Sequence, residues 1–258
     1  MELVGSLQRL IVPGRCAACG VRAETLCRRC RVALAHGRYA AGPRLVRPSP
    51  CPAQMPPCWA AAGLDGVLRV LLTAYKDADR RDLAGVLAPL LAAAIRAAME
   101  APRLPEARPD GPRPSVLLVP VPASGRSRRR RGDRPLESLV VGAAELLPGP
   151  VRVIRVLRPV RATRDQSGLD AEARRVNLAG AMALAPGAVD LLGGHRVVLV
   201  DDIVTTGATL VEGARALGAA GVSVRAAVIA ATPRRAFATR PAAVVTGEST
   251  VVAPPKPD

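Results

Sequence analysis

Residues 197–210 read VVLVDDIVTTGATL, and this stretch decides both the expected fold and the expected site. Four branched apolar residues in a row predict a strand that is buried on both faces, as in a parallel sheet. Two carboxylates, Asp201 and Asp202, follow where that strand ends. A short hydroxyl-rich loop comes next, and then an apolar spacing that is typical of a helix. The order is therefore strand, acid pair, small loop and helix N-terminus.

The loop suits a phosphate group. A loop that enters a helix exposes unpaired backbone N–H groups, and the helix dipole adds about half a positive charge there. Glycine lets the backbone adopt positive φ and approach a ligand closely, and threonine hydroxyls add donors. The two carboxylates would repel a phosphate, so we expect them to face sugar hydroxyls and Mg²⁺ on the same ligand. The residues expected to bind phosphate are Thr205, Thr206, Gly207, Ala208 and Thr209.

This stretch resembles the 5-phosphoribosyl-1-pyrophosphate (PRPP) motif of type I phosphoribosyltransferases. It is not a Walker A loop, because the only lysines are Lys76 and Lys256 and neither follows a glycine. No Gly-x-Gly-x-x-Gly fingerprint follows a strand, so a dinucleotide site is also excluded. The alternative is an ordinary buried strand followed by an acidic turn. That alternative leaves the paired acids and the three threonines unexplained.

Composition sets the broad class of the protein. At 258 residues, 49% of them apolar, the chain suits one medium domain with a small appendage. It contains no run of eighteen apolar residues, so we expect no membrane insertion. The first residues lack a basic segment and a cleavage site, which argues against a secretory signal. We therefore expect a cytoplasmic protein.

The charge favours anionic partners. The formal net charge is +16, from 37 basic and 21 acidic residues. Such a field attracts polyanions over a long range, and both nucleic acid and a pyrophosphorylated sugar fit it. The chain has one Phe, one Trp and two Tyr, and so few aromatic residues weaken the case for base stacking on single strands.

Four cysteines near the N-terminus have the spacing of a zinc site. Cys16 and Cys19 form one C-x2-C pair, and Cys27 and Cys30 form another. Two such pairs can complete a tetrahedral Zn²⁺ site with no open position, which implies a structural role. Redox chemistry and disulfides are the alternatives, and two adjacent pairs in a cytosolic chain favour zinc over both. The role of the remaining two cysteines, Cys51 and Cys58, stays open between a second site and plain buried thiols.

The rest of the chain alternates helical and strand patterns, which predicts an α/β fold with a parallel sheet and helices on both faces. Pro89 should kink or break the second helix, and Asp133 is a plausible N-cap before Pro135. Residues 36–58 and 158–178 show no regular pattern, and we expect a linker and a mobile polar segment there. The expected helices are 64–77, 83–95, 136–147 and 210–221, and the expected strands are 116–121, 151–156, 197–200 and 222–231.

Several motifs occur in an order that resembles the ComF family. Besides the cysteine pairs and the PRPP motif, they are Tyr75-Lys76, Pro120-Val121-Pro122 before an Arg-Gly loop, and a block with Arg161, Thr163, Gln166, Leu169, Arg174 and Asn177. The resemblance runs from the first cysteine pair to about residue 231. It implies a type I phosphoribosyltransferase domain behind a zinc-binding N-terminus. The implied division is 1–58 for the cysteine segment and linker, 59–231 for the phosphoribosyltransferase-like domain, and 232–258 for a loose tail.

The resemblance also implies roles for single residues. Asp201 and Asp202 would be the catalytic pair that meets the ribose hydroxyls, and Arg131 and Gly132 would lie near the pyrophosphate. The chain departs from the family here, because the usual Arg-Gly-Phe-Asn-Gln is Arg131-Gly132-Asp133-Arg134-Pro135. The usual Phe after Asn177 corresponds to Met182, a packing substitution. Further residues that can bind an anion are Lys76, Arg128, Arg129 and Arg130.

Two functions remain open from the sequence. The first is an enzyme that transfers phosphoribosyl from PRPP, with Mg²⁺, to an unknown acceptor; the family is associated with DNA uptake and natural competence. The second is a non-catalytic accessory protein that handles single-stranded DNA or senses PRPP, and possible partners are the competence machinery and DNA itself. The arginine run fits either function, and charge runs are often only solvated surface.

Overall fold

The computed structural model describes residues 14–102, 115–123, 134–163 and 170–232. The expected roles of Arg128, Arg129, Arg130, Arg131 and Gly132 fall outside these residues, as does almost all of the expected tail.

The fold is built on a mostly parallel sheet. The strands lie side by side in the order β1-β2-β9-β7-β3-β4, and the short β8 pairs with β9. Each neighbouring pair is parallel except β1 with β2. The expected α/β class is therefore confirmed. The strands of this sheet are β1 (Arg44–Val46), β2 (Cys58–Gly63), β3 (Val116–Pro120), β4 (Val151–Val153), β7 (Arg196–Val200), β8 (Ile203–Val204) and β9 (Val224–Ala231).

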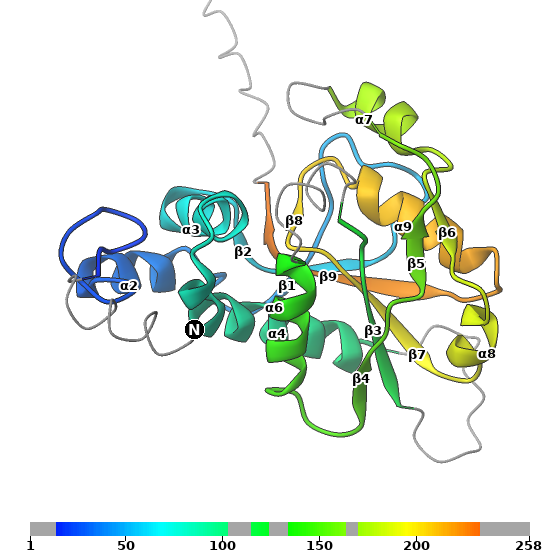
Figure 1. Ribbon diagram of the computed structural model, residues 1–258, viewed down its shortest axis with the longest axis horizontal. Coiled ribbons are helices and arrows are strands. Elements are labelled where there is room, and N and C mark those ends of the chain that lie inside the picture. Colours follow the sequence, from blue (N-terminus) through cyan, green and yellow to red (C-terminus); the bar gives the residue numbers. More distant parts are fainter. Residues whose placement is uncertain (1–13, 103–114, 124–133, 164–169, 233–258) are drawn as a thin grey trace, which may run out of the picture.

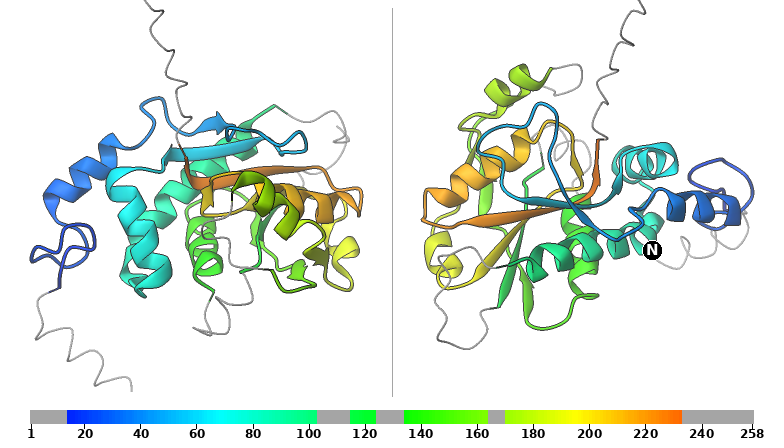
Figure 2. Two further views of the ribbon diagram at one scale, coloured as in Figure 1. Left: turned by 90° about the horizontal axis from the view of Figure 1, so that it is seen from above. Right: turned by 180° about the vertical axis from the view of Figure 1, so that it is seen from behind.

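Helices and a small second sheet cover the two faces, so the molecule has two cores (Figure 1, Figure 2). One core contains α4 and α6 on one face together with α3 and, packed against α3, α2; the other packs α8, α9 and the β5–β6 pair against the opposite face. Both faces of β9 are buried along its whole length, as a central parallel strand requires. The helices and the remaining strands are α2 (Arg28–His36), α3 (Gly66–Asp77), η1 (Arg81–Leu83), α4 (Ala84–Glu100), α6 (Pro135–Ala144), β5 (Leu157–Pro159), α7 (Ala171–Leu178), β6 (Met182–Leu184), α8 (Ala188–Leu192) and α9 (Ala208–Gly218).

Helix α4 runs through Pro89 without a break, so of the expected kink or break the break is wrong. Leu87, Leu91 and Ile95 are fully buried, and the helix packs against β9, β2 and α6. This packing holds the helix together although Pro89 cannot donate a backbone hydrogen bond. Among the described residues, Arg81–Glu100 is one helix that is long and apolar enough to cross a membrane, yet half of it is buried inside the fold. In this fold the helix therefore packs in the core, against one face of the sheet.

Two segments that were expected to lack regular structure contain some. Strand β1 lies in the segment 36–58 and pairs in antiparallel register with β2, so Leu45 faces Trp59. Residues 158–178 contain part of β5 and all of α7, and β5 pairs with β6. Helix α6 starts at Pro135 with Arg134, rather than Asp133, as its N-cap. The division of the chain into domains stays a prediction.

Candidate functional site

The candidate site lies where the central strands end. Val200 is the last residue of β7, and it pairs with Pro120 at the end of β3 and with Ala227 in β9. The chain moves outward from β3 to β4 on one side of β7 and from β7 to β9 on the other. The strand order therefore reverses between β3 and β7, and open parallel sheets bind their ligands at the ends of such strands.

The acid pair is buried at this point. Asp201 is 9% exposed and Asp202 is 7% exposed. The backbone N–H of Asp202 donates to Oδ1 of Asp201 at 2.8 Å, and the Asp202 carbonyl accepts from the N–H groups of Ile229 and Ala230 at 3.0 and 3.2 Å. Burial, helped by the neighbouring charge of Asp202, raises the pKa of Asp201 to about 8. Two carboxylates held this close to each other favour a cation or a hydroxyl-rich ligand.

Lys76 contacts the acid pair directly. It comes from the last turn of α3, and its Nζ lies 2.5 Å from Oδ2 of Asp202. Burial by itself would lower the pKa of Lys76, but attraction to Asp202 and Asp201 outweighs it and the pKa is raised. The preceding Tyr75 is buried, and its hydroxyl donates to the Pro135 carbonyl at 3.0 Å, which ties α3 to the start of α6. The Tyr-Lys pair thus brings one cation to the acids.

The expected phosphate loop is a tight turn into α9. Strand β8 follows the acids, Thr205 and Thr206 come next, and α9 begins at Ala208, which leaves Thr209 in its first turn. Gly207 has φ +79°, a backbone angle that residues other than glycine rarely adopt. A Cβ at this position would lie 2.6 Å from Sδ of Met55 and 3.3 Å from Cγ of Pro48. The segment between β1 and β2 therefore lies directly against the loop, a contact that the sequence did not predict.

A second helix reaches the same loop. Arg174 on α7 donates from Nη1 to Oγ1 of Thr205 at 3.2 Å. The sequence motifs placed Arg174 in the family block without giving it a function, and they did not predict the contact. Glu212 on α9 was missed entirely: it is 3% exposed and accepts from the N–H groups of Gly180 and Met182 and from Arg215. A buried acid in an otherwise apolar helix face is the signal that could have revealed it.

A basic recess adjoins the loop after β3. The backbone N–H of Val121 donates to the Val200 carbonyl at 2.9 Å, so this loop begins beside the acid pair. A cavity of about 190 Å³ opens between the loop, the first turn of α6 and β5. Glu137 in its wall pairs with Arg134 at 2.8 Å and with Arg155 at 2.6 Å. The recess is lined by Pro120, Pro122, Ala123, Arg134, Glu137, Arg155, Leu157, Arg158 and Pro159.

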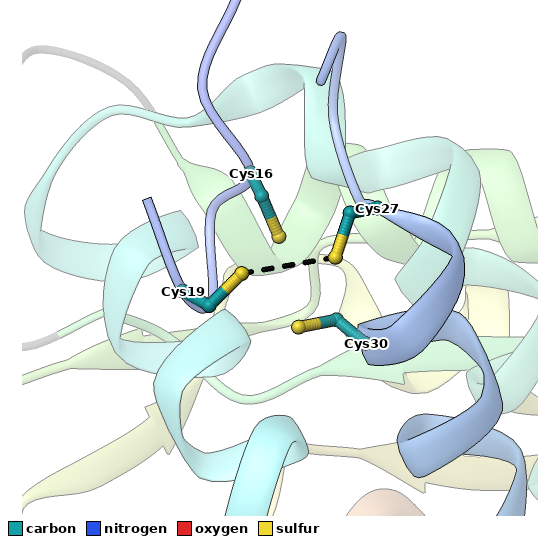
Figure 3. A group of neighbouring side chains, drawn as sticks. All are labelled: Cys16, Cys19, Cys27 and Cys30. Carbon is teal, nitrogen blue, oxygen red and sulfur yellow. Dashed lines mark hydrogen bonds between the residues drawn. The ribbon is translucent and has the colours of Figure 1, made fainter. Parts of the chain in front are cut away.

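The four N-terminal cysteines form one cluster, at the opposite end of the molecule from α7 (Figure 1). Their Sγ atoms lie within 4.8 Å of one another and point toward a common centre (Figure 3). Sγ of Cys19 lies 3.7 Å from Sγ of Cys27. Tetrahedral zinc with Zn–S bonds of about 2.3 Å separates its sulfurs by about 3.8 Å, which fits this spacing. The cluster can therefore hold a structural metal such as zinc.

The charges in the cysteine cluster also favour a cation. Burial would raise the pKa of Cys16, but hydrogen bonds from backbone N–H groups, that of Cys27 foremost, lower it to about 6. Burial and the neighbouring thiols raise the pKa of Cys30 to about 12. Because the charge of Cys16 disfavours a second thiolate at Cys30, a bound cation would relieve this repulsion.

The last two cysteines lie outside this cluster. Cys58 is fully buried in β2, and burial together with the nearby Asp201 raises the pKa of its thiol. Cys51 is exposed in the segment before β2.

Comparison with known proteins fits this geometry. A profile of the phosphoribosyl transferase domain family matches residues 156–253. The DNA utilization protein YhgH of Salmonella typhi is 32% identical over 217 residues, which is 82% of this chain and 88% of that protein. The YhgH protein of Escherichia coli O157:H7 is 30% identical over the same length. Competence protein F of Haemophilus influenzae is 32% identical over 157 residues, which is 60% of this chain and 63% of that protein.

The chain belongs to the ComF family. The resemblance drawn from the motifs is thereby confirmed. The acid pair and the phosphate loop lie within the matched residues, while Lys76 and the cysteine cluster precede them. The match also runs past residue 231 into the segment that was expected to be a tail.

Proposed function

We propose that this ComF-family protein binds PRPP with Mg²⁺ at the end of β7 and transfers its phosphoribosyl group to an acceptor. The observation that carries this proposal is the juxtaposition of a buried acid pair with a positive-φ loop that opens a helix. The sugar end of a sugar phosphate needs groups that accept hydrogen bonds from its hydroxyls, and the phosphate end needs N–H donors. The site offers both within a few residues of one strand end.

In this assignment each part of the site has one role. Asp201 and Asp202 accept hydrogen bonds from the two ribose hydroxyls, and the backbone of Thr205–Thr209 binds the 5-phosphate. The loop from Val121 to Ala123 lies beside Val200, which supports a position next to the pyrophosphate. Catalysis would come mainly from holding the reacting groups in place and from stabilising the departing charge. The neighbouring Arg131 and Gly132 belong to the same proposal through the family pattern.

The acid pair also suits Mg²⁺, because carboxylate oxygens are hard ligands and magnesium commonly combines one or two of them with substrate phosphates. Bound there, the ion would neutralise charge on the pyrophosphate. Lys76 already balances part of the acid charge, since its ammonium contacts Asp202. We infer that Lys76 lowers the free-energy cost of burying the acid pair before a ligand binds. It also lies close enough to the site to attract an anionic ligand.

The proposal is tested by calorimetric titration of PRPP with Mg²⁺ into wild type and into the double variant Asp201→Asn, Asp202→Asn. The control is Asp190→Asn, which removes an exposed acid from α8. We expect saturable binding by wild type and the control and at least a tenfold loss in the double variant. Equal binding by all three proteins would remove the acid pair from the site. No binding by folded, metal-loaded wild type would reject the proposal.

A link to DNA uptake is proposed from the relatives, whose names refer to competence and to DNA utilization. The net charge of +16 favours a second candidate, a PRPP-sensing accessory that contacts single-stranded DNA without phosphoribosyl transfer. Replacing Arg128, Arg129, Arg130 and Arg131 by glutamine should then weaken DNA binding and flatten its salt dependence. DNA affinity that is unchanged, or absent at low salt, would reject this candidate.

We also propose zinc as the metal of the cysteine cluster and the cytoplasm as the location of the protein. The domain boundaries 1–58, 59–231 and 232–258 remain part of the proposal, although β1 already belongs to the main sheet.

A further inference from the structure

Side-chain hydrogen bonds hold both ends of helix α7, one within the helix and the others to the segment that follows β5. At its start the Asp170 side chain accepts from the N–H of Ala173 at 2.7 Å. At its end Arg161 donates to the carbonyls of Asn177 and Ala179 at 2.9 and 2.6 Å. The position of α7 is thus set by several hydrogen bonds.

Glu212 ties the segment that directly follows α7, residues 179–182, to α9, the helix that follows the phosphate loop. Its carboxylate accepts from the N–H of Gly180 at 3.1 Å and from the N–H of Met182 at 2.8 Å. Because α9 also presents the loop, the helix that carries Arg174 and the loop that it contacts are held by one rigid element. The fold therefore places α7 beside the phosphate loop, within reach of the Arg174 side chain.

The contact that Arg174 makes with Thr205 is a weak one. Its guanidinium donates to the neutral hydroxyl of Thr205 at 3.2 Å. A phosphate bound at the start of α9 would be a far stronger acceptor, because a guanidinium forms charge-assisted and often bidentate bonds to phosphate. Thr205 is itself one of the residues expected to bind that phosphate, so the guanidinium already lies at the edge of the anion site.

We propose that Arg174 is a binding residue for the 5-phosphate of the sugar ligand and supplies a charge that the loop backbone lacks. The inference rests on the proposed function, because it names a further group in the same site. It also gives α7 a role, since this helix brings a second cation to the site besides Lys76. Ligands that carry the 5-phosphate should depend on Arg174, and ligands that lack it should not.

The test compares Arg174→Gln with Arg175→Gln. Arg175 is the next residue of α7, and it pairs on the exposed side with Glu172, so it controls for loss of charge and for changes in the helix. Each protein is titrated with PRPP plus Mg²⁺, with ribose 5-phosphate, and with pyrophosphate plus Mg²⁺. We expect Arg174→Gln to weaken the first two by about 10- to 100-fold and to leave pyrophosphate within about twofold of wild type.

Arg174→Lys serves as a second variant in case the glutamine variant does not fold. It keeps the charge but loses the bidentate geometry, so we expect ribose 5-phosphate affinity between those of wild type and Arg174→Gln. An equal loss for pyrophosphate would mean that Arg174 is only structural, and a loss no larger than that of Arg175→Gln would mean that it contacts no phosphate. Either result overturns this inference and leaves the proposed function intact. If wild type binds none of the three ligands, the proposed function fails and the inference fails with it.

Discussion

The Lys76 ammonium lies 2.5 Å from Oδ2 of Asp202, so a side chain from α3 neutralises a carboxylate at the end of β7. The contact joins the Tyr-Lys pair to the acid pair, which are far apart in the sequence. It also pairs one of the two buried acids with a positive charge. Without such a counterion, two adjacent buried carboxylates would strongly oppose folding.

Asp201 should give the stability of the fold a pH dependence that is opposite to that of an ordinary paired carboxylate. Its pKa in the folded state is raised to about 8, whereas an unfolded aspartate titrates near about 3.9. The contribution of the neutral carboxyl is complete below the unfolded pKa and is lost as the pH rises toward the folded one. The free energy of unfolding of wild type, relative to Asp201→Asn, should therefore fall between pH 4 and about pH 8. Urea unfolding at several pH values measures this, and a constant difference would refute it.

Gly207→Ala should disrupt the loop for two separable reasons. Positive φ costs a non-glycine residue about 1–2 kcal/mol, and the new Cβ would push the flexible Met55 side chain aside at a smaller further cost. Gly218→Ala is the control, because Gly218 ends the same helix with no atom near its missing Cβ, so the substitution should be neutral or slightly stabilising. The double variant Met55→Ala, Gly207→Ala should recover only the part of the loss due to the overlap. Chemical denaturation of wild type and the three variants measures these effects, and equal stability of the two single glycine variants would contradict the assignment.

Glu212→Gln should weaken the attachment of the segment after α7, residues 179–182, to α9. The carboxylate holds two backbone N–H groups and Arg215 in a buried setting, and hydrogen bonds to a charged group contribute about 1.5–3 kcal/mol. Burial would raise the pKa of Glu212, but Arg215 and the backbone donors outweigh it and the pKa is lowered. Its contribution is therefore present at neutral pH and is lost as the pH falls below the usual glutamate range.

The matched control for Glu212→Gln is Glu172→Gln. It breaks an Arg–Glu pair of the same i,i+3 spacing on the exposed face of α7. Exposed pairs contribute little, so we expect no measurable change there. Thermal unfolding of both variants at neutral pH and at pH near 4 distinguishes them. An equal change in thermal stability for the two variants would show that the buried hydrogen bonds of Glu212 do not hold residues 179–182 against α9.

The cysteine cluster should bind one zinc ion per chain. Cys27→Ser removes one of four ligands and should abolish stable binding, whereas Cys51→Ser should leave it intact because Cys51 lies outside the cluster. A structural zinc site contributes on the order of 10 kcal/mol, so its loss should unfold the region around α2. Metal analysis by mass spectrometry, with hydrogen exchange of α2 and the main sheet, provides the readout. Full zinc content in Cys27→Ser would contradict the site.

Local patterns in the sequence predicted much of the fold and the position of the candidate site. The order of strand, acid pair, loop and helix at 197–210 depends only on neighbouring residues, and the structure has that order with β8 added. The cysteine spacing likewise predicted the cluster. Such signals are readable because the backbone itself brings the residues together.

What the sequence did not reveal depends on packing between distant elements. Pro89 lies inside a continuous helix because burial outweighs its local effect, and β1 forms because β2 offers it an edge. The contacts of Met55 with Gly207 and of Arg174 with Thr205 bring together segments with no shared periodicity. A single sequence carries no signal for pairs of this kind, so these parts of the site required the structure.

Hydrogen exchange of wild type with and without PRPP and Mg²⁺ tests the central claim most directly, because it shows where the ligand lies. We expect slowed exchange of the backbone N–H groups from Thr206 to Leu210 and of the loop from Val121 to Ala123, with no change around the cysteine cluster. Slowed exchange only elsewhere, or none at saturating ligand, would contradict the claim that the end of β7 binds a phosphorylated sugar.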